Sequence, residues 1–175
     1  MRGASFRGMA LSHADFALAD ARGCDFADAV LQGADLRLGR FEGANFRMAD
    51  LRNADMRGAE MRNADLSGAN LAGANLQLAV VVQCNLSDAV LDGAILDGAD
   101  ARLAYFHHAS MERASLRGAV LMGARMQFAD LRDADLTLAV LANADLTGAD
   151  LRVAQLGGAI FRGATTTDTR FDPGG

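Results

Sequence analysis

The sequence predicts an all-β solenoid, a chain that coils repeatedly around one apolar core. Three observations predict it: a large apolar residue recurs at every fifth position, an alanine stands two places before it, and glycine, asparagine or aspartate often stands two places after it. A period of five is neither the 3.6 of a helix nor the 2 of a flat strand. A short extended piece followed by a corner, repeated, therefore makes a coil.

The large apolar positions stay in register from Phe6 to Phe161 and are mostly Leu, Met or Phe. We call this the central position of each five-residue unit. Of the 33 positions two places earlier, from 4 to 164, alanine fills 29. Residues two apart in an extended chain point to the same side. Both sets should therefore face the interior, where small walls and large fillers allow close packing.

The corner position, two places after the centre, holds 15 of the 19 glycines. Glycine adopts positive φ at no steric cost, and asparagine and aspartate tolerate it. Leucine occupies four corners on one face, at Leu18, Leu38, Leu78 and Leu138. We interpret these leucines as marking a different type of turn.

Three runs show the unit in its plainest form: residues 64–68 read Ala-Asp-Leu-Ser-Gly, residues 69–73 Ala-Asn-Leu-Ala-Gly and residues 144–148 Ala-Asp-Leu-Thr-Gly. They resemble the A(D/N)LXX motif of the pentapeptide-repeat family, and the resemblance covers about residues 4 to 168. It implies a right-handed quadrilateral parallel β-helix of about eight four-sided coils. Residues 20 apart should then stack, so we expect Phe6, Phe26 and Phe46 to form an aromatic ladder.

We expect one pentapeptide-repeat domain over residues 1–168 and a C-terminal cap or tail over residues 169–175. Pro173 cannot continue a ladder of backbone hydrogen bonds, and the Phe-Asp-Pro ending is similar to that of many bacterial members of the family. Cys24 and Cys84 take alanine positions three coils apart, too far for a disulfide, so they are expected to be small buried residues.

The charge and hydropathy of the chain exclude some classes of function. A net charge of −5 argues against direct nucleic-acid binding, which needs a basic surface. No apolar run approaches the ~20 residues that span a bilayer, and no signal peptide is visible. We therefore expect a cytoplasmic protein that does not associate with membranes.

Aspartate is frequent just before the centre, and 13 of the 17 arginines stand just after it. The candidate acidic interaction surface consists of one stacked row and one acidic band: Asp15, Asp35 and Asp55 in the row, and Asp88, Asp92, Asp97 and Asp100 in the band. One interpretation is solvated ion pairing, with each pair contributing under ~1 kcal/mol. The other is a row of carboxylates that imitates DNA phosphates.

Two further surface groups stand out. A candidate apolar interface comprises outward-facing residues on one side: Val80, Val82, Val120, Met122, Val140 and Ile160. An exposed apolar stripe predicts an interface with a protein partner or in a homodimer, whereas the alternative is that β-branched residues simply favour extended chain. A candidate aromatic patch comprises Tyr105, His108 and Phe128, next to His107, and is either a binding hot spot or incidental.

The chemistry of catalysis is not apparent in the sequence. The histidines and cysteines lack metal-ligand spacing, no nucleophile stands beside a base, and no phosphate-binding loop is present. We predict no enzyme, no metal and no cofactor. The function predicted is a protein-interaction module or scaffold whose partner the sequence does not identify.

The family resemblance implies an alternative function. Members of the Qnr and MfpA kind bind DNA gyrase by imitating duplex DNA and protect it from quinolone-type inhibitors. The sequence departs from the Qnr kind in having no loop that interrupts the repeat. We also expect it to lack the C-terminal helical dimerisation module of the MfpA kind.

Overall fold

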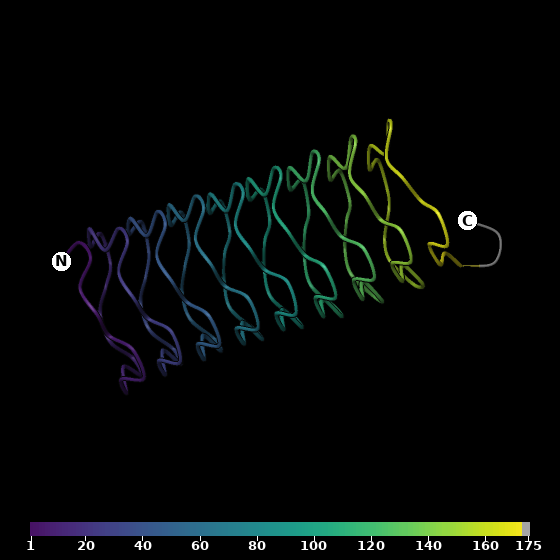
Figure 1. Ribbon diagram of the computed structural model, residues 1–175. Helices are drawn as coiled ribbons and strands as arrows, with labels where there is room; N and C mark the ends of the chain where they lie inside the picture. Colours follow the sequence, from purple (N-terminus) through teal and green to yellow (C-terminus); the bar gives the residue numbers. More distant parts are fainter. Residues whose placement is uncertain (173–175) are drawn as a thin grey trace.

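The computed structural model describes residues 1–172, which form an elongated rod with the first and the last described residues near its opposite ends (Figure 1). Pro173 and the rest of the expected C-terminal cap or tail lie outside the described residues. Coils succeed one another along the rod in sequence order. Within residues 1–172 there is neither a helix nor a strand longer than one bridge residue. The architecture consists instead of isolated parallel β-bridges joined by two-residue turns.

The bridges fix the register of the coil. Every fifth residue from Ser5 to Asp150 pairs in parallel with the residue 20 places later, the last pair being Asp150 with Arg170. Four five-residue units therefore complete one turn, and each coil has four sides. The predicted 20-residue stacking is confirmed, and the fold is a parallel β-solenoid.

Backbone hydrogen bonds join each side of a coil to the next coil. The Phe26 amide donates to the Asn45 carbonyl over 2.7 Å, and the Asn45 amide donates to the Cys24 carbonyl over 2.9 Å. The Asp28 amide donates to the Arg47 carbonyl over 2.9 Å. Because this pattern recurs along the rod, each coil is held mainly by its two neighbours, as in other solenoids.

All corners share one backbone geometry. A bond such as that from the Ala29 amide to the Phe26 carbonyl, 3.1 Å long, closes each turn. The third residue of the turn has positive φ at every corner from Gly3 to Asp168, between 54° and 72°. Leu18, Leu38, Leu78 and Leu138 fall within this range. The interpretation of these leucines as a different turn is therefore wrong, because the ladder on either side demands the same corner of every residue.

Several large corner side chains lie over a glycine in the following coil. A Cβ added to Gly58 would lie 2.7 Å from Leu38 Cδ2, and one added to Gly98 would lie 2.9 Å from Leu78 Cδ2. The glycine thus leaves room for the side chain above it. The left-handed backbone of a non-glycine corner still costs ~1 kcal/mol.

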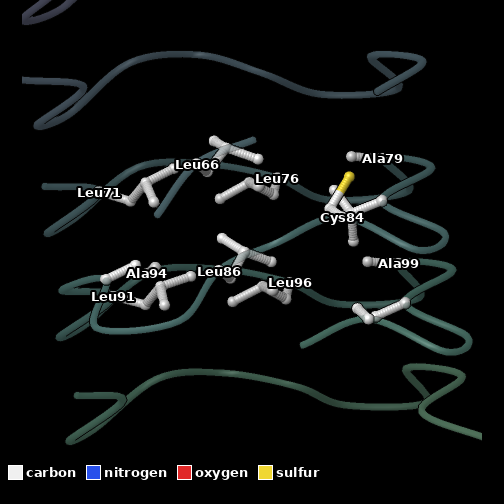
Figure 2. Close-up of a cluster of buried hydrophobic side chains, with 14 of the residues drawn as sticks. Leu66, Leu71, Leu76, Ala79, Cys84, Leu86, Leu91, Ala94, Leu96 and Ala99 are labelled. Atoms are coloured by element: carbon white, nitrogen blue, oxygen red, sulfur yellow. The ribbon is translucent and has the colours of Figure 1, made fainter. Parts of the chain in front are cut away.

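The interior is apolar throughout its length. In Figure 2 Leu66, Leu71 and Leu76 lie in one layer, and the residues 20 places later lie in the layer below. These central side chains are fully buried, as are most of the alanines, and no polar side chain is buried in the part of the chain that the structure describes. The core is therefore filled by alternating alanine and large apolar ladders.

The predicted aromatic ladder is confirmed. The ring centroids of Phe6 and Phe26 lie 4.9 Å apart, and those of Phe26 and Phe46 lie 4.8 Å apart, with nearly parallel planes. Cys24 and Cys84 are free and buried, as expected. The Cys84 thiol donates to the Met61 carbonyl over 2.7 Å, and burial raises its pKa to about 12. Such a thiol is a packing residue and not a nucleophile.

Met48 provides a test of the corner geometry, since it has φ 58° and a side chain that is 58% exposed. Met48→Gly should be more stable than Met48→Ala by roughly 0.5–1 kcal/mol. Only glycine relieves the strain of the left-handed backbone, and its larger loss of conformational entropy on folding offsets part of that gain. Urea unfolding at neutral pH measures the difference. An alanine variant that is as stable as the glycine variant would contradict the role assigned to this corner.

Candidate interaction surfaces

The aspartate or asparagine before the centre has a structural task. The amide of the residue just after the centre takes no part in the ladder described above. The Asp25 carboxylate accepts a hydrogen bond from the Ala27 amide over 3.1 Å, and the Asn70 side chain does the same for Ala72 over 3.1 Å. Fifteen such bonds occur within residues 1–172. The acidic position thus satisfies an amide at the corner.

Asp15, Asp35 and Asp55 form the stacked row that the sequence predicts, since they bridge one another in succession. Two of these carboxylates are bound by a guanidinium. Arg37 lies 2.5 Å from Asp35, and Arg57 lies 2.6 Å from Asp55. Their negative charge is therefore partly compensated beside each carboxylate, which makes the row a weaker likeness of DNA phosphates than the sequence alone suggests.

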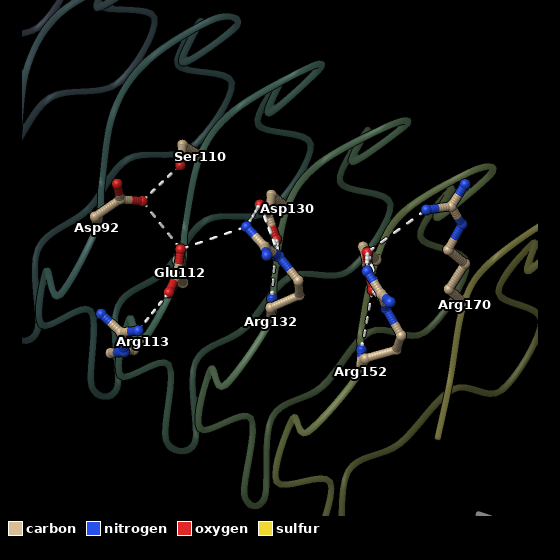
Figure 3. Close-up of polar contacts among 9 residues, drawn as sticks. Asp92, Ser110, Glu112, Arg113, Asp130, Arg132, Arg152 and Arg170 are labelled. Carbon is tan, nitrogen blue, oxygen red and sulfur yellow. Dashed lines mark hydrogen bonds and ion pairs between the residues drawn. The ribbon is translucent and has the colours of Figure 1, made fainter. Parts of the chain in front are cut away.

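The acidic band includes two aspartates that act across coils. Serines stand at positions 110 and 115, where aspartate or asparagine usually satisfies the corner amide. Asp92 accepts from the Ser110 hydroxyl over 2.6 Å and from the Glu112 amide over 3.1 Å (Figure 3). Asp97 does the same for Ser115 and the Arg117 amide.

Sequence reasoning did not predict that Asp92 and Asp97 supply the acceptor that Ser110 and Ser115 lack, although an aspartate 18 places before each serine was a usable signal. The other two members of the band lie elsewhere on the coil. Asp100 pairs with Arg102 over 2.7 Å, and Asp88 occupies a corner with φ 58°. Whether any of these residues contacts a partner stays a prediction.

Ion pairs lower the pKa of several carboxyl groups. The hydrogen bond from the Arg132 side chain holds the pKa of Asp130 below its ordinary value, and Arg152 does the same for Asp150. Figure 3 shows the pair of Asp130 and Arg132, together with the contact of Arg132 with Glu112 in the preceding coil. These are half-exposed pairs, and each contributes little to stability.

The candidate apolar interface belongs to a larger surface. We call it the apolar face and define it as Leu78, Val80, Val82, Leu103, Val120, Met122, Leu138, Val140 and Ile160. Val80, Asp100, Val120, Val140 and Ile160 bridge one another in that order. The side chains of Leu78 and Leu138 at its edge are 66% and 63% exposed. Sequence reasoning left Leu78 and Leu138 out of this surface because it assigned these leucine corners to turn geometry alone, and it did not consider Leu103.

Two shallow grooves accompany the apolar side chains. One, of about 420 Å³, is lined by Val82, Arg102, Leu103, Met122, Gly123 and Asn143. The other, of about 550 Å³, follows the corner that holds Leu18, Leu38 and Leu78, beside Arg37 and Arg57. Both are open to solvent on the surface of a filled solenoid.

The candidate aromatic patch is only partly assembled. The His108 ring stacks on Phe128 with centroids 5.2 Å apart, as the 20-residue register predicts. The His107 ring lies edge to face with the Phe128 ring, and their centroids are 5.7 Å apart. Tyr105 instead lies under the guanidinium of Arg125, 5.1 Å from its ring centre. A binding role of this patch stays a prediction.

A family model finds the same five-residue repeat. The model described as "Pentapeptide repeats" matches the chain in eight copies over residues 1–37, 40–77, 69–106, 84–123, 102–137 and 124–163. The chain belongs to the pentapeptide-repeat family. No curated protein matches it.

Solved structures of pentapeptide-repeat proteins resemble this member of the family. HetL of the cyanobacterium Nostoc sp. strain PCC 7120, involved in the regulation of heterocyst differentiation, is 29% identical with a TM-score of 0.59. The match covers 97% of this chain and 84% of HetL. A trypsin-treated variant of QnrB1, a plasmid-mediated fluoroquinolone resistance protein, has a TM-score of 0.70 at 20% identity. That match covers 98% of this chain and 88% of QnrB1, and it shows a shared fold alone.

Across residues 1–172, no three His, Cys, Asp or Glu side chains come together in a group that could hold a metal ion. No helix in that range is long and apolar enough to cross a bilayer.

The paired carboxyls predict how stability of the repeat depends on pH. Their pKa values are lower in the folded chain than in the unfolded one, so their contribution is present above the unfolded value of about 3.9 and is lost as pH falls through the folded value. We expect the free energy of unfolding to decline below about pH 4. In Arg132→Gln the decline should be smaller, since Asp130 loses the hydrogen bond that lowers its pKa. Urea titrations between pH 7 and pH 2 measure both, and parallel curves for the two proteins would contradict the assignment.

Proposed function

We propose that this pentapeptide-repeat protein is a non-enzymatic protein-interaction module that binds through its apolar face. The observation that carries the proposal is a run of apolar side chains on one side of the rod, from Leu78 to Ile160. Five of them are exposed and four are half-buried: Leu78, Leu103, Met122, Leu138 and Ile160 are exposed, and Val80, Val82, Val120 and Val140 are half-buried. Contiguous apolar surface on a folded protein marks an interaction site. In this proposal the protein is a right-handed quadrilateral solenoid of about eight coils, and it acts in the cytoplasm.

Packing explains why the surface is expected to carry the function. The interior is filled by alanine and by leucine, methionine and phenylalanine, most of them with no exposed area. A filled core offers no enclosed pocket in which a substrate could be kept from water. What varies from unit to unit is the outward-facing set of side chains, and a rigid rod can display these at fixed spacing.

The apolar face differs from what backbone structure alone demands. The position before the centre usually carries an aspartate or asparagine that satisfies a corner amide, yet Val80, Val120 and Val140 give up that bond. The same position could hold aspartate without steric conflict, as Asp100 shows on the same face. Replacing a satisfying group by valine at these half-buried sites costs stability of the fold, which favours a role in binding.

Two matched variants test the proposal. Val120→Asp places a charge on the apolar face, whereas Val30→Asp makes the same change at the equivalent position of another side. Each new carboxylate would stand one coil from an aspartate that an arginine already pairs, Asp100 or Asp50. Both variants should fold, because aspartate is the usual residue there.

We expect Val120→Asp to reduce association with protein at least tenfold and Val30→Asp to leave it unchanged. Association is measured by chemical cross-linking in cells and by capture on the immobilised protein, with circular dichroism as the control for folding. Equal association of both variants and the unchanged protein would refute the proposed use of this face.

The alternative function is a DNA mimic that binds DNA gyrase and confers resistance to quinolone-type inhibitors. The net charge of −5 and the elongated rod support it, while the arginines beside Asp35 and Asp55 favour the first proposal. The test is gyrase supercoiling with and without a quinolone, in the presence of purified protein. A gyrase-binding mimic should inhibit supercoiling or protect it from the drug, and neither effect at micromolar protein would eliminate this alternative.

A further inference from the structure

The side of the solenoid that carries the apolar face has a second property, which concerns its charges. Each coil presents two outward residues on this side, one just before and one just after the central residue. We call them the first and second columns of the side. They are Asp20 and Arg22, Arg40 and Glu42, Glu60 and Arg62, Val80 and Val82, Asp100 and Arg102, Val120 and Met122, Val140 and Ala142, and Ile160 and Arg162.

The two columns are complementary in seven of these eight coils. An acidic residue in the first column stands beside a basic residue in the second. At Arg40 and Glu42 the first column is basic and the second is acidic. Apolar residues of the first column stand beside apolar residues of the second. The exception is Ile160 beside Arg162, where the aliphatic stem of an arginine can still cover an apolar neighbour. The bridges stack the first column in direct succession from Asp20 to Ile160.

The other sides of the rod do not share this property. One side sets Val90 beside Asp92 and Ser110 beside Glu112. Another sets Ile95 beside Asp97. Complementarity of the two columns is therefore not a general consequence of the repeat, which by itself requires only the hydrogen-bond acceptor before the centre.

We infer that the apolar face binds a second copy of this chain, with the two rods parallel and in register about a twofold axis that runs along the rods. The inference rests on the proposed use of the apolar face and names its occupant. Such an axis places the first column of one copy opposite the second column of the other. Asp100 then faces Arg102 of the second copy, and Val120 faces Met122 of the second copy.

The parallel arrangement matches both the apolar and the charged parts of the side. Face-to-face β-layers pack about 10 Å apart, which brings facing side chains into contact. In the first coils Asp20 would face Arg22 of the second copy, and Glu60 would face Arg62. An antiparallel pair centred on Val120 would instead set Asp100 against Val140, leaving a charge opposite an apolar side chain. Charge complementarity therefore selects the parallel pair.

Within one copy the same groups already pair, Asp20 with Arg22 over 2.8 Å and Asp100 with Arg102 over 2.7 Å. Association places two such pairs head to tail, so each charge gains a second opposite neighbour and none is buried without a partner. This arrangement lets an otherwise apolar face tolerate the Asp100–Arg102 pair.

Exchange of single charges tests the inference in a way that pairing within one copy cannot imitate. In Asp100→Arg both columns of that coil are basic, and in Arg102→Asp both are acidic. Each variant alone should repel itself and weaken self-association roughly tenfold or more. An equimolar mixture should restore the dimer, because basic then faces acidic at both contacts.

Sedimentation equilibrium of the full chain measures the outcome, with a dimer at twice 18.3 kDa. Glu60→Arg and Arg62→Glu form a second complementary set, needed because Asp100 also accepts from the Arg102 amide and its replacement could impair folding. Circular dichroism checks each variant. The inference is overturned by a monomeric unchanged protein, by single variants that dimerise as well as the unchanged protein, or by mixtures that remain monomeric.

The outcomes also separate this inference from the proposed function. A monomeric protein that still captures another protein in a way that Val120→Asp abolishes would overturn the second copy as occupant and keep the apolar face as a binding site. A monomer whose associations Val120→Asp does not change would overturn both.

Discussion

Every feature of this solenoid depends on a corner that recurs at each fifth residue with a left-handed backbone. The corner turns the chain, and four corners return it to the residue 20 places earlier, where the backbone ladder closes. Because the ladder admits only this geometry, leucine, methionine and phenylalanine corners adopt it as glycine does, at a cost in strain. Regular spacing of the outward side chains follows directly from this uniformity.

The same geometry explains the residues of the motif. Alanine lines the walls, and the central residue fills the interior. The aspartate or asparagine between them accepts a hydrogen bond from the amide of the residue just after the centre, which takes no part in the backbone ladder. Much of the acidic surface is therefore structural. Asp92 and Asp97 make the point most clearly, since they replace a missing acceptor in the next coil. Aspartates that accept backbone amides or pair with arginine are weak evidence for imitation of DNA in this fold. Only the remaining acidic residues bear on that function.

The outward residues that the fold does not require are the ones that can serve a function such as binding. On the side from Leu78 to Ile160, valine takes the place of the amide acceptor in three coils, and three corners, at Leu78, Leu103 and Leu138, carry leucine where glycine would be unstrained. Both departures reduce the stability of a single coil. The proposed binding face and its pairing with a second copy account for them together, because contacts made on association would offset these local costs.

The sequence by itself determined the coil, its register and its core. A period of five with alanine and large apolar positions predicted a coil around an apolar core. The family resemblance implied four units per coil, and from this Phe6, Phe26 and Phe46 were expected to stack. Only the tertiary structure decided what the surface residues contact. That Leu78 shares the ordinary corner follows from the backbone ladder to the neighbouring coils. That Tyr105 lies under Arg125 and not on His108, and that Asp92 accepts from the Glu112 amide, depend on side-chain directions between coils, which the spacing of residues along the chain does not specify.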